Sequence, residues 1–113
     1  MSSGTAEIPD FDELLGGMAA ALKPHQRPVL IAMLERVAAG RYRQWAADPG
    51  YGQHRDALLA CGEREIQIAE RIEALYDDVA TVQQEVQAQL PALAGVEEEL
   101  FGGRTIPEQF AVL

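Results

Sequence analysis

A regular stripe of apolar residues in the second half of the chain constrains the fold more than any other feature of the sequence. It occupies eleven positions from Leu58 to Leu93, at steps of three and four, and nine of the eleven are apolar. Such a stripe turns one face of a helix toward a neighbouring helix, as in a coiled coil. It keeps its phase across Asp77, and no proline lies between residues 53 and 90. We therefore expect one long helix over residues 53–90, with two helices broken near Asp77 as the alternative.

Proline and glycine mark the ends of a second long helix. Pro28 suits a first helical turn, because the N–H that proline lacks has no helical partner there. The Pro49–Gly50 pair stops the helix, so we expect it over residues 28–48. The connection to the helix at 53–90 is short, and a short connection returns the chain beside itself. The two long helices should therefore form an antiparallel hairpin.

The two ends of the chain are less regular. Asp10 and Glu13 have the spacing of a helix N-cap and its reciprocal acid, which predicts a short leading helix over residues 10–22. Residues 1–9 are expected to form a flexible N-terminus. Residues 96–113 are expected to form an apolar tail, extended by its glycines, that docks either on this chain or on a protein partner.

These segments predict an all-α fold with a single helical domain over residues 1–113. A hairpin with a short leading helix does not cover all of its apolar surface. A hairpin from a second copy would cover the rest and complete a four-helix bundle. We therefore expect a homodimer.

The charge balance argues against several classes of partner. Eighteen acidic and nine basic side chains give a formal net charge of −9, and this field repels nucleic-acid phosphates and anionic lipid headgroups. We therefore expect no nucleic-acid partner and no membrane partner. Cys61 is the single cysteine, so no disulfide forms within the chain, as suits a reducing compartment. The acidic opening lacks the pattern of an export signal, and we expect a cytoplasmic protein.

One charged residue, Glu65, occupies a position of the apolar stripe. Helical packing would bury its carboxylate, and a buried charge is costly unless a cation, a metal ion or a proton compensates it. One interpretation pairs Glu65 with an arginine of the preceding helix, Arg41 or Arg43, or places it at a wet edge of the stripe. The other interpretation makes it a metal ligand or an acid–base group.

Glu35 and Tyr42 lie seven residues apart in the preceding helix and therefore share a face. This pattern resembles the ferritin-like family, including the rubrerythrin-like proteins, whose first core helix carries a Glu and, seven residues later, a Tyr. The next core helix of that family supplies a Glu followed three residues later by a His. Glu65 takes the place of that Glu here, but Ile68 stands where the His would be. The resemblance covers roughly residues 28–76.

The resemblance implies a reduced, half-length relative of that family, completed by dimerisation. Glu35 and Glu65 would then be the metal ligands, and Tyr42 would donate a hydrogen bond to a ligand. Carboxylate oxygens without imidazole favour Mg, Ca or Mn over zinc or iron. The structural alternative leaves Glu35 solvated and Tyr42 in the core.

Three hypotheses for the function follow. The first is a non-catalytic helical assembly or binding protein with no cofactor. The second is a carboxylate-bridged metal-binding protein with oxidase or metal-storage chemistry, holding a divalent metal ion at Glu35 and Glu65. The third is an adapter that binds a partner helix. The sequence has no residue order typical of a catalytic triad or a phosphate loop. We favour a protein that is not an enzyme, and oxidase chemistry stays open under the second hypothesis.

Overall fold

The structure is a computed structural model, and it describes residues 10–113. The predicted flexible segment, residues 1–9, lies outside the described residues. The described part is all helical and contains no strand, which confirms the predicted fold class. Its α-helices are α1 (Phe11–Ala20), α2 (Arg27–Ala46), α3 (Arg55–Glu73), α4 (Val79–Gln89), α5 (Val96–Phe101) and α6 (Ile106–Val112), with 3-10 helices η1 (Pro24–Gln26), η2 (Pro49–His54) and η3 (Pro91–Gly95) between them. Along these residues, no helix combines the length and apolar character needed to cross a lipid bilayer.

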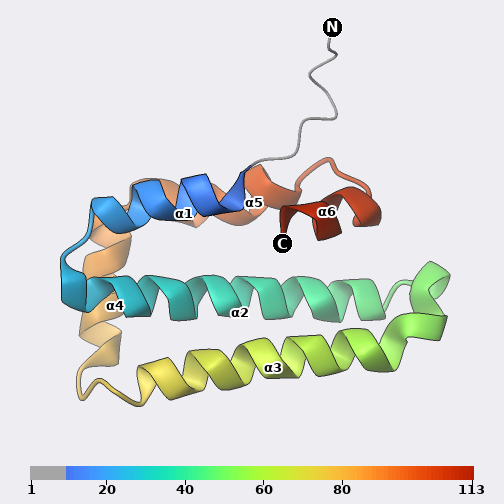
Figure 1. The fold of residues 1–113 in the computed structure, drawn as a ribbon, viewed down its shortest axis with the longest axis horizontal. Coiled ribbons are helices and arrows are strands. Elements are labelled where there is room, and N and C mark those ends of the chain that lie inside the picture. Colours follow the sequence, from blue (N-terminus) through green and yellow to red (C-terminus); the bar gives the residue numbers. More distant parts are fainter. Residues whose placement is uncertain (1–9) are drawn as a thin grey trace, which may run out of the picture.

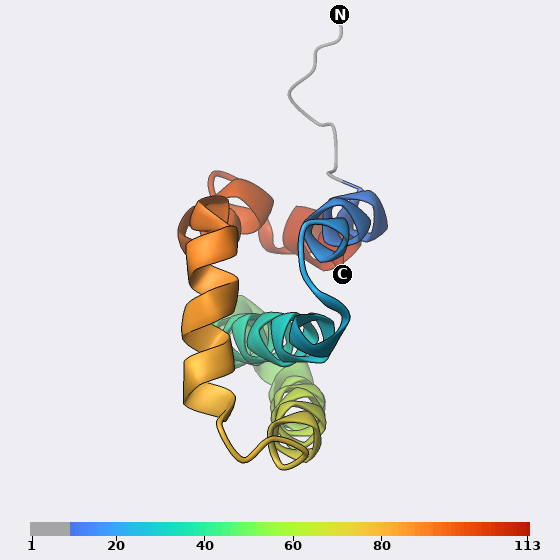
Figure 2. The ribbon, with the colours of Figure 1, turned by 90° about the vertical axis from the view of Figure 1, so that its left-hand side faces the viewer.

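Helix α2 lies at the centre of the molecule (Figure 1). Helix α3 runs beside it in the opposite direction, and α1, α5 and α6 lie along its other edge. Helix α4 crosses one side of this layer, and Figure 2 shows no helix over the opposite side among the described residues. The result is a thin slab of 42 × 38 × 17 Å. One side of α2 and α3, which we call the open side, is therefore left uncovered by residues 10–113.

The predicted ends of the first two helices agree with the structure to within two residues. The Asp10 carboxylate caps α1 by accepting a hydrogen bond of 3.0 Å from the Glu13 N–H. Pro28 lies in the first turn of α2, as expected. Helix α2 ends at Ala46, and Asp48 then accepts a hydrogen bond of 2.8 Å from the Gly50 N–H, which fixes the turn into η2. Local sequence signals thus set these boundaries.

Helices α2 and α3 pack closely because small residues line their contact. Ala32, Ala39 and Ala69 are completely buried between them. A Cβ placed on Gly62 would lie 3.4 Å from the Ala39 carbonyl oxygen and 3.4 Å from the Tyr42 Cβ. No side chain larger than a methyl group fits in that space.

An ion pair joins the middle of α2 to the C-terminal end of α3. The Arg36 guanidinium donates hydrogen bonds of 2.8 and 2.6 Å to the two carboxylate oxygens of Glu73. This bidentate contact lowers the pKa of the Glu73 carboxyl below its ordinary value, chiefly through the hydrogen bond from Arg36. The pair is partly exposed to water, so its contribution to stability is modest.

The expected single helix over residues 53–90 is wrong, and the alternative break near Asp77 is correct. Helix α3 ends at Glu73 and α4 begins at Val79. The physical reason is the length of the partner helix. A helix of 38 residues would be about 57 Å long, whereas the 20 residues of α2 span only about 30 Å. Helix α3, with 19 residues, matches the 20 residues of α2 in length, and a much longer α3 would project past the end of α2.

The turn between α3 and α4 is anchored by a contact that is distant in sequence. The Tyr76 hydroxyl donates a hydrogen bond of 2.6 Å to the carbonyl oxygen of His25 in η1. Leu75, a position of the apolar stripe, is 79% exposed here. Val82 and Val86, further along the same stripe, are buried in the core. Three positions of the stripe are buried, most of the others are half-buried, and the stripe is divided between two helices that contact α2 from different sides.

The predicted apolar tail, residues 96–113, is not extended but folds into α5 and α6, and it docks on its own chain. The Trp45 ring stacks on Phe110 with ring centroids 4.3 Å apart and meets Phe101 edge-on at 6.3 Å. The Trp45 indole N–H donates a hydrogen bond of 2.8 Å to the side chain of Gln109. This aromatic cluster holds α5 and α6 against the C-terminal half of α2.

The close approach of α2 and α3 predicts a size limit at Gly62. Gly62→Ala should keep or raise the free energy of unfolding, because alanine favours the helix by up to about 1 kcal/mol and the added methyl makes ordinary contacts. Gly62→Leu should lower it by roughly 1–3 kcal/mol, because the side chain forces the helices apart. Urea unfolding measures both. Gly40 of α2, where a Cβ meets nothing within 4 Å, provides the control: Gly40→Leu should not destabilise. Equal tolerance of leucine at positions 40 and 62 would contradict the packing described.

Candidate functional site

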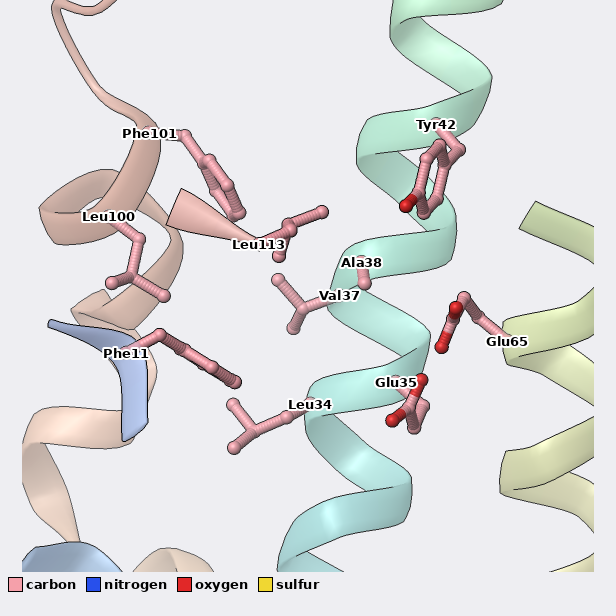
Figure 3. Close-up of a pocket in the computed structure, with 10 residues that line it drawn as sticks. All are labelled: Phe11, Leu34, Glu35, Val37, Ala38, Tyr42, Glu65, Leu100, Phe101 and Leu113. Carbon is pink, nitrogen blue, oxygen red and sulfur yellow. The ribbon is translucent and has the colours of Figure 1, made fainter. Parts of the chain in front are cut away.

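A hollow of about 250 Å³ opens over the middle of α2 (Figure 3). The small side chain of Ala38 lines it between the apolar side chains and the two carboxylates. Polar groups from α2 and α3 line one part of it, and apolar side chains from α2 and from both ends of the described chain line the other. The lining residues are Phe11, Leu34, Glu35, Val37, Ala38, Tyr42, Glu65, Leu100, Phe101 and Leu113.

The hollow belongs to the open side of the slab. Glu35, Ala38 and Tyr42 are spaced by three and four residues, so they form one stripe along α2. Met33 lies on a different face of α2, where it lines a separate cleft with Gln87 near the end of α4. The stripe with the two polar groups therefore points away from α4.

Glu65 reaches the same hollow from α3. The small residues between the helices, Ala39 and Gly62, bring α3 close enough for this. Figure 3 shows the Glu35 and Glu65 carboxylates beside each other on the same flank of α2. The three residues that the sequence singled out, Glu35, Tyr42 and Glu65, thus come together in one place.

Neither carboxylate has a hydrogen-bond or ion-pair partner within residues 10–113. The expected pairing of Glu65 with Arg41 or Arg43 is not formed. Arg41 instead lies 3.2 Å from the Glu97 carboxylate of α5, with its guanidinium 4.9 Å above the Phe101 ring. Partial burial without a compensating charge raises the pKa of the Glu65 carboxyl above its ordinary value.

Tyr42 forms the end of the hollow next to the C-terminal helix. Its ring meets Trp45 edge-on at 5.3 Å and Phe110 at 6.2 Å, and Figure 3 shows its hydroxyl directed toward the hollow. Burial is the main cause that raises the pKa of this hydroxyl, while the positive charge of Arg64 lowers it. Tyr42 therefore stays protonated at neutral pH and can both donate and accept a hydrogen bond.

The hollow supplies too few groups for a complete metal site. Among the residues described, no group of three or more His, Cys, Asp and Glu side chains is arranged to hold a metal ion. Ile68, at the place of the family's histidine, offers no ligand atom. The two histidines lie in other elements, His25 in η1 and His54 in η2. A metal ion bound by Glu35 and Glu65 would therefore need ligands from water or from a second molecule.

Exposed apolar side chains surround the hollow. Five large apolar side chains are exposed in the described part of the chain, and three of them lie here. Leu113 lines the hollow directly, and Phe110 contacts Tyr42. Ile31 lies four residues before Glu35 on the same stripe of α2. An exposed apolar patch around a concavity is typical of a ligand-binding groove or a protein-interaction surface.

The sequence did not reveal the apolar wall formed by the two ends of the described chain. Phe11 begins α1, whereas Leu100 and Phe101 end α5 and Leu113 directly follows α6. Only the general apolar character of residues 96–113 was visible. No spacing relates these residues to Glu35, because their position depends on how α5 and α6 dock on Trp45.

Comparison with known proteins finds no matching family model, no matching curated protein and no matching solved structure.

The raised pKa of Glu65 predicts a stability effect that depends on pH. Because the folded-state pKa lies above the unfolded-state pKa, ionisation of Glu65 destabilises the fold. This cost is absent at pH values below both pKa values and is fully present above both. Glu65→Gln should therefore raise the melting temperature at pH 7, and the difference from the unmodified protein should vanish below about pH 4.

Glu73 on the same helix is the matched control, because its pKa shifts in the opposite direction. Its interaction with Arg36 stabilises the fold above the unfolded-state pKa and is lost as the pH falls through the folded-state pKa. Glu73→Gln should therefore lower stability at pH 7, by at most about 1 kcal/mol for such an exposed pair. A Glu65→Gln variant that behaves like Glu73→Gln would show that Glu65 has a stabilising partner.

Proposed function

We propose that this chain is a non-catalytic helical binding protein and that the hollow over Ala38 is its binding site. The observation that carries the proposal is the composition of the hollow. An apolar wall faces two carboxylates that no group of the described chain compensates. Concave sites with an apolar wall and a few polar groups are the usual form of small-ligand sites.

The surrounding fold supports this proposal, because it holds the lining residues on packed elements. Glu35, Ala38 and Tyr42 lie on the central helix, which has the largest share of the buried core. Glu65 is held by the closely packed α3, and the apolar wall is held by the aromatic contacts of Trp45. A site built on packed helices keeps its shape before the ligand arrives, which lowers the entropy cost of binding.

Blocking the hollow should abolish binding. We expect that a screen of small neutral, cationic and anionic compounds by ¹H–¹⁵N NMR will show shifts in the amides of residues 35–42 and Leu113. Ala38→Trp should remove these shifts, because the indole fills the hollow. Ala88→Trp, at an exposed position of α4, should leave them unchanged. The proposal fails if no compound shifts these amides, or if the shifts persist in Ala38→Trp while circular dichroism shows an intact fold.

A second candidate function is favoured by the meeting of Glu35 and Glu65 in one hollow. If two copies pack through the open side, α2 and α3 of each would form a four-helix bundle, as in a reduced ferritin-like protein. Four carboxylates would then face one another around the twofold axis. Their repulsion in a poorly hydrated interface requires a cation. This candidate is a homodimer held by a carboxylate-bridged divalent metal ion.

Light scattering after size-exclusion chromatography tests this metal-bridged dimer. Under this candidate, Mg²⁺, Ca²⁺ or Mn²⁺ should shift the chain from monomer to dimer, and a chelator should reverse the shift. Glu65→Gln should abolish the effect, whereas Glu63→Gln, at an exposed position of α3, should preserve it. Elemental analysis of the dimer should find the metal. A monomer at all metal concentrations, or a dimer that ignores the chelator, would exclude it.

A further inference from the structure

We propose that the hollow binds a small organic cation, an alkyl or aryl ammonium ion whose charged group lies between Glu35 and Glu65 and whose apolar body lies over Ala38 against Leu113. This inference rests on the proposed binding function and names the chemical class of its ligand. It follows from the two parts of the hollow: the two carboxylates favour a positively charged group, and the apolar wall favours a hydrocarbon group.

The charge of the hollow has no counterpart in its lining. Among the described residues that line it, two carry carboxylates and none is a lysine or an arginine. The half-buried Arg41 contacts Glu97 and Phe101, and Arg36 is paired with Glu73. Both guanidinium groups are therefore already engaged elsewhere.

One further arginine lies near the hollow. The positive charge of Arg64 lowers the pKa of the Tyr42 hydroxyl. The Arg64 side chain is nevertheless exposed, and it forms no ion pair with Glu35 or Glu65 in the described structure. The formal net charge of −9 adds a field that attracts cations to the whole chain. The positive charge that complements the two carboxylates must therefore come from a ligand.

The apolar half distinguishes an organic cation from a bare metal ion. A metal ion would contact oxygens and leave the Phe11, Leu34 and Leu113 side chains exposed to water. An ammonium ion with a hydrocarbon body covers these side chains while its N–H groups donate to the carboxylates. Burying the apolar body and forming charge-assisted hydrogen bonds both favour the bound state.

Desolvation explains why a neutral ligand of the same shape should bind less well. Any ligand over Ala38 removes water from Glu35 and Glu65. A cation compensates the two charges, whereas an alcohol leaves them short of a counter-charge and a carboxylic acid adds a third negative charge. The hollow should therefore rank ligands of one length in the order amine, alcohol, carboxylate.

The volume of the hollow limits the size of the ligand. About 250 Å³ is just below the range of about 300–1,000 Å³ that is usual for small-molecule sites. The ligand should therefore be small, with a short hydrocarbon body. The Tyr42 hydroxyl, directed into the hollow, can accept one further hydrogen bond from the ammonium group.

A matched series of three compounds tests the inference on the full chain. Hexylamine, hexanol and hexanoate have the same hydrocarbon body and differ in charge. We expect NMR titration at pH 7 to give hexylamine at least about tenfold tighter binding than hexanol, because charge-assisted hydrogen bonds are roughly twice as strong as neutral ones. Hexanoate should not bind. The shifts should centre on residues 35–42 and Leu113.

Substitutions separate the two carboxylates from the general acidity of the chain. The double variant Glu35→Gln and Glu65→Gln should lower hexylamine affinity to that of hexanol and leave hexanol binding no weaker than before. Glu63→Gln removes one charge from an exposed position of α3 and should leave hexylamine affinity unchanged. Circular dichroism checks the fold of each variant.

The outcomes distinguish this inference from the binding function on which it rests. If hexanol binds as tightly as hexylamine, the inference is wrong. If Ala38→Trp then abolishes binding of both compounds, the proposed binding function still stands. Hexylamine binding that persists in the double variant, or that falls equally in Glu63→Gln, also overturns the inference. If no compound of any charge binds over Ala38, both proposals fail.

Discussion

The close contact between α2 and α3 is the constraint on which the rest of the structure depends. Small residues on both helices, among them Ala39 and Gly62, allow the backbones to approach with almost no side chain between them. Close approach brings Glu65 of α3 beside Glu35 of α2. It also sets the length over which α3 can stay helical, because α3 gains burial only where α2 lies beside it. Both the candidate site and the break after Glu73 follow from this single contact.

The C-terminal helices have a second role, since they form the opposite wall of the hollow. Trp45 binds them through two ring contacts and one hydrogen bond. Phe101 both contacts Trp45 and lines the hollow, so it links the docking of α5 to the apolar wall. The apolar wall therefore exists only in the completed fold. Unlike the Glu35–Glu65 pair, which needs only two helices, it depends on contacts between residues more than fifty positions apart in the sequence.

Sequence reasoning succeeded where local physics decides the structure. The cap at Asp10, the helix start near Pro28 and the stop at Pro49 follow from backbone hydrogen bonding over a few residues. The apolar stripe also identified Leu58 and Val86 as buried. Periodicity reports which face of a helix is buried, but it does not report how long the partner is. A stripe that keeps its phase is therefore compatible with one helix or with two.

The candidate site was predictable in its polar half and not in its apolar half. The spacing of Glu35 and Tyr42 places them on one face, and a charged residue within an apolar stripe drew attention to Glu65. Its partner could not be predicted in the same way. Arg41 was a reasonable candidate by sequence, but it lies next to α5, where it pairs with Glu97 and stacks over Phe101 in place of binding Glu65.

Because Arg41 and Arg36 pair with other acids, Glu35 and Glu65 have no positively charged partner within the described residues. Arg41 is bound to Glu97 of α5 and Arg36 to Glu73 of α3, and Arg43, which also lies on α2, forms no ion pair with either carboxylate in the described structure. The fold tolerates the two carboxylates because the hollow is open and water still reaches them. Partial burial nevertheless raises the pKa of the Glu65 carboxyl. Whatever closes the hollow, whether a ligand or a second copy, must replace that water. Electrostatics thus selects a positively charged occupant, and the apolar wall selects one that also carries hydrocarbon.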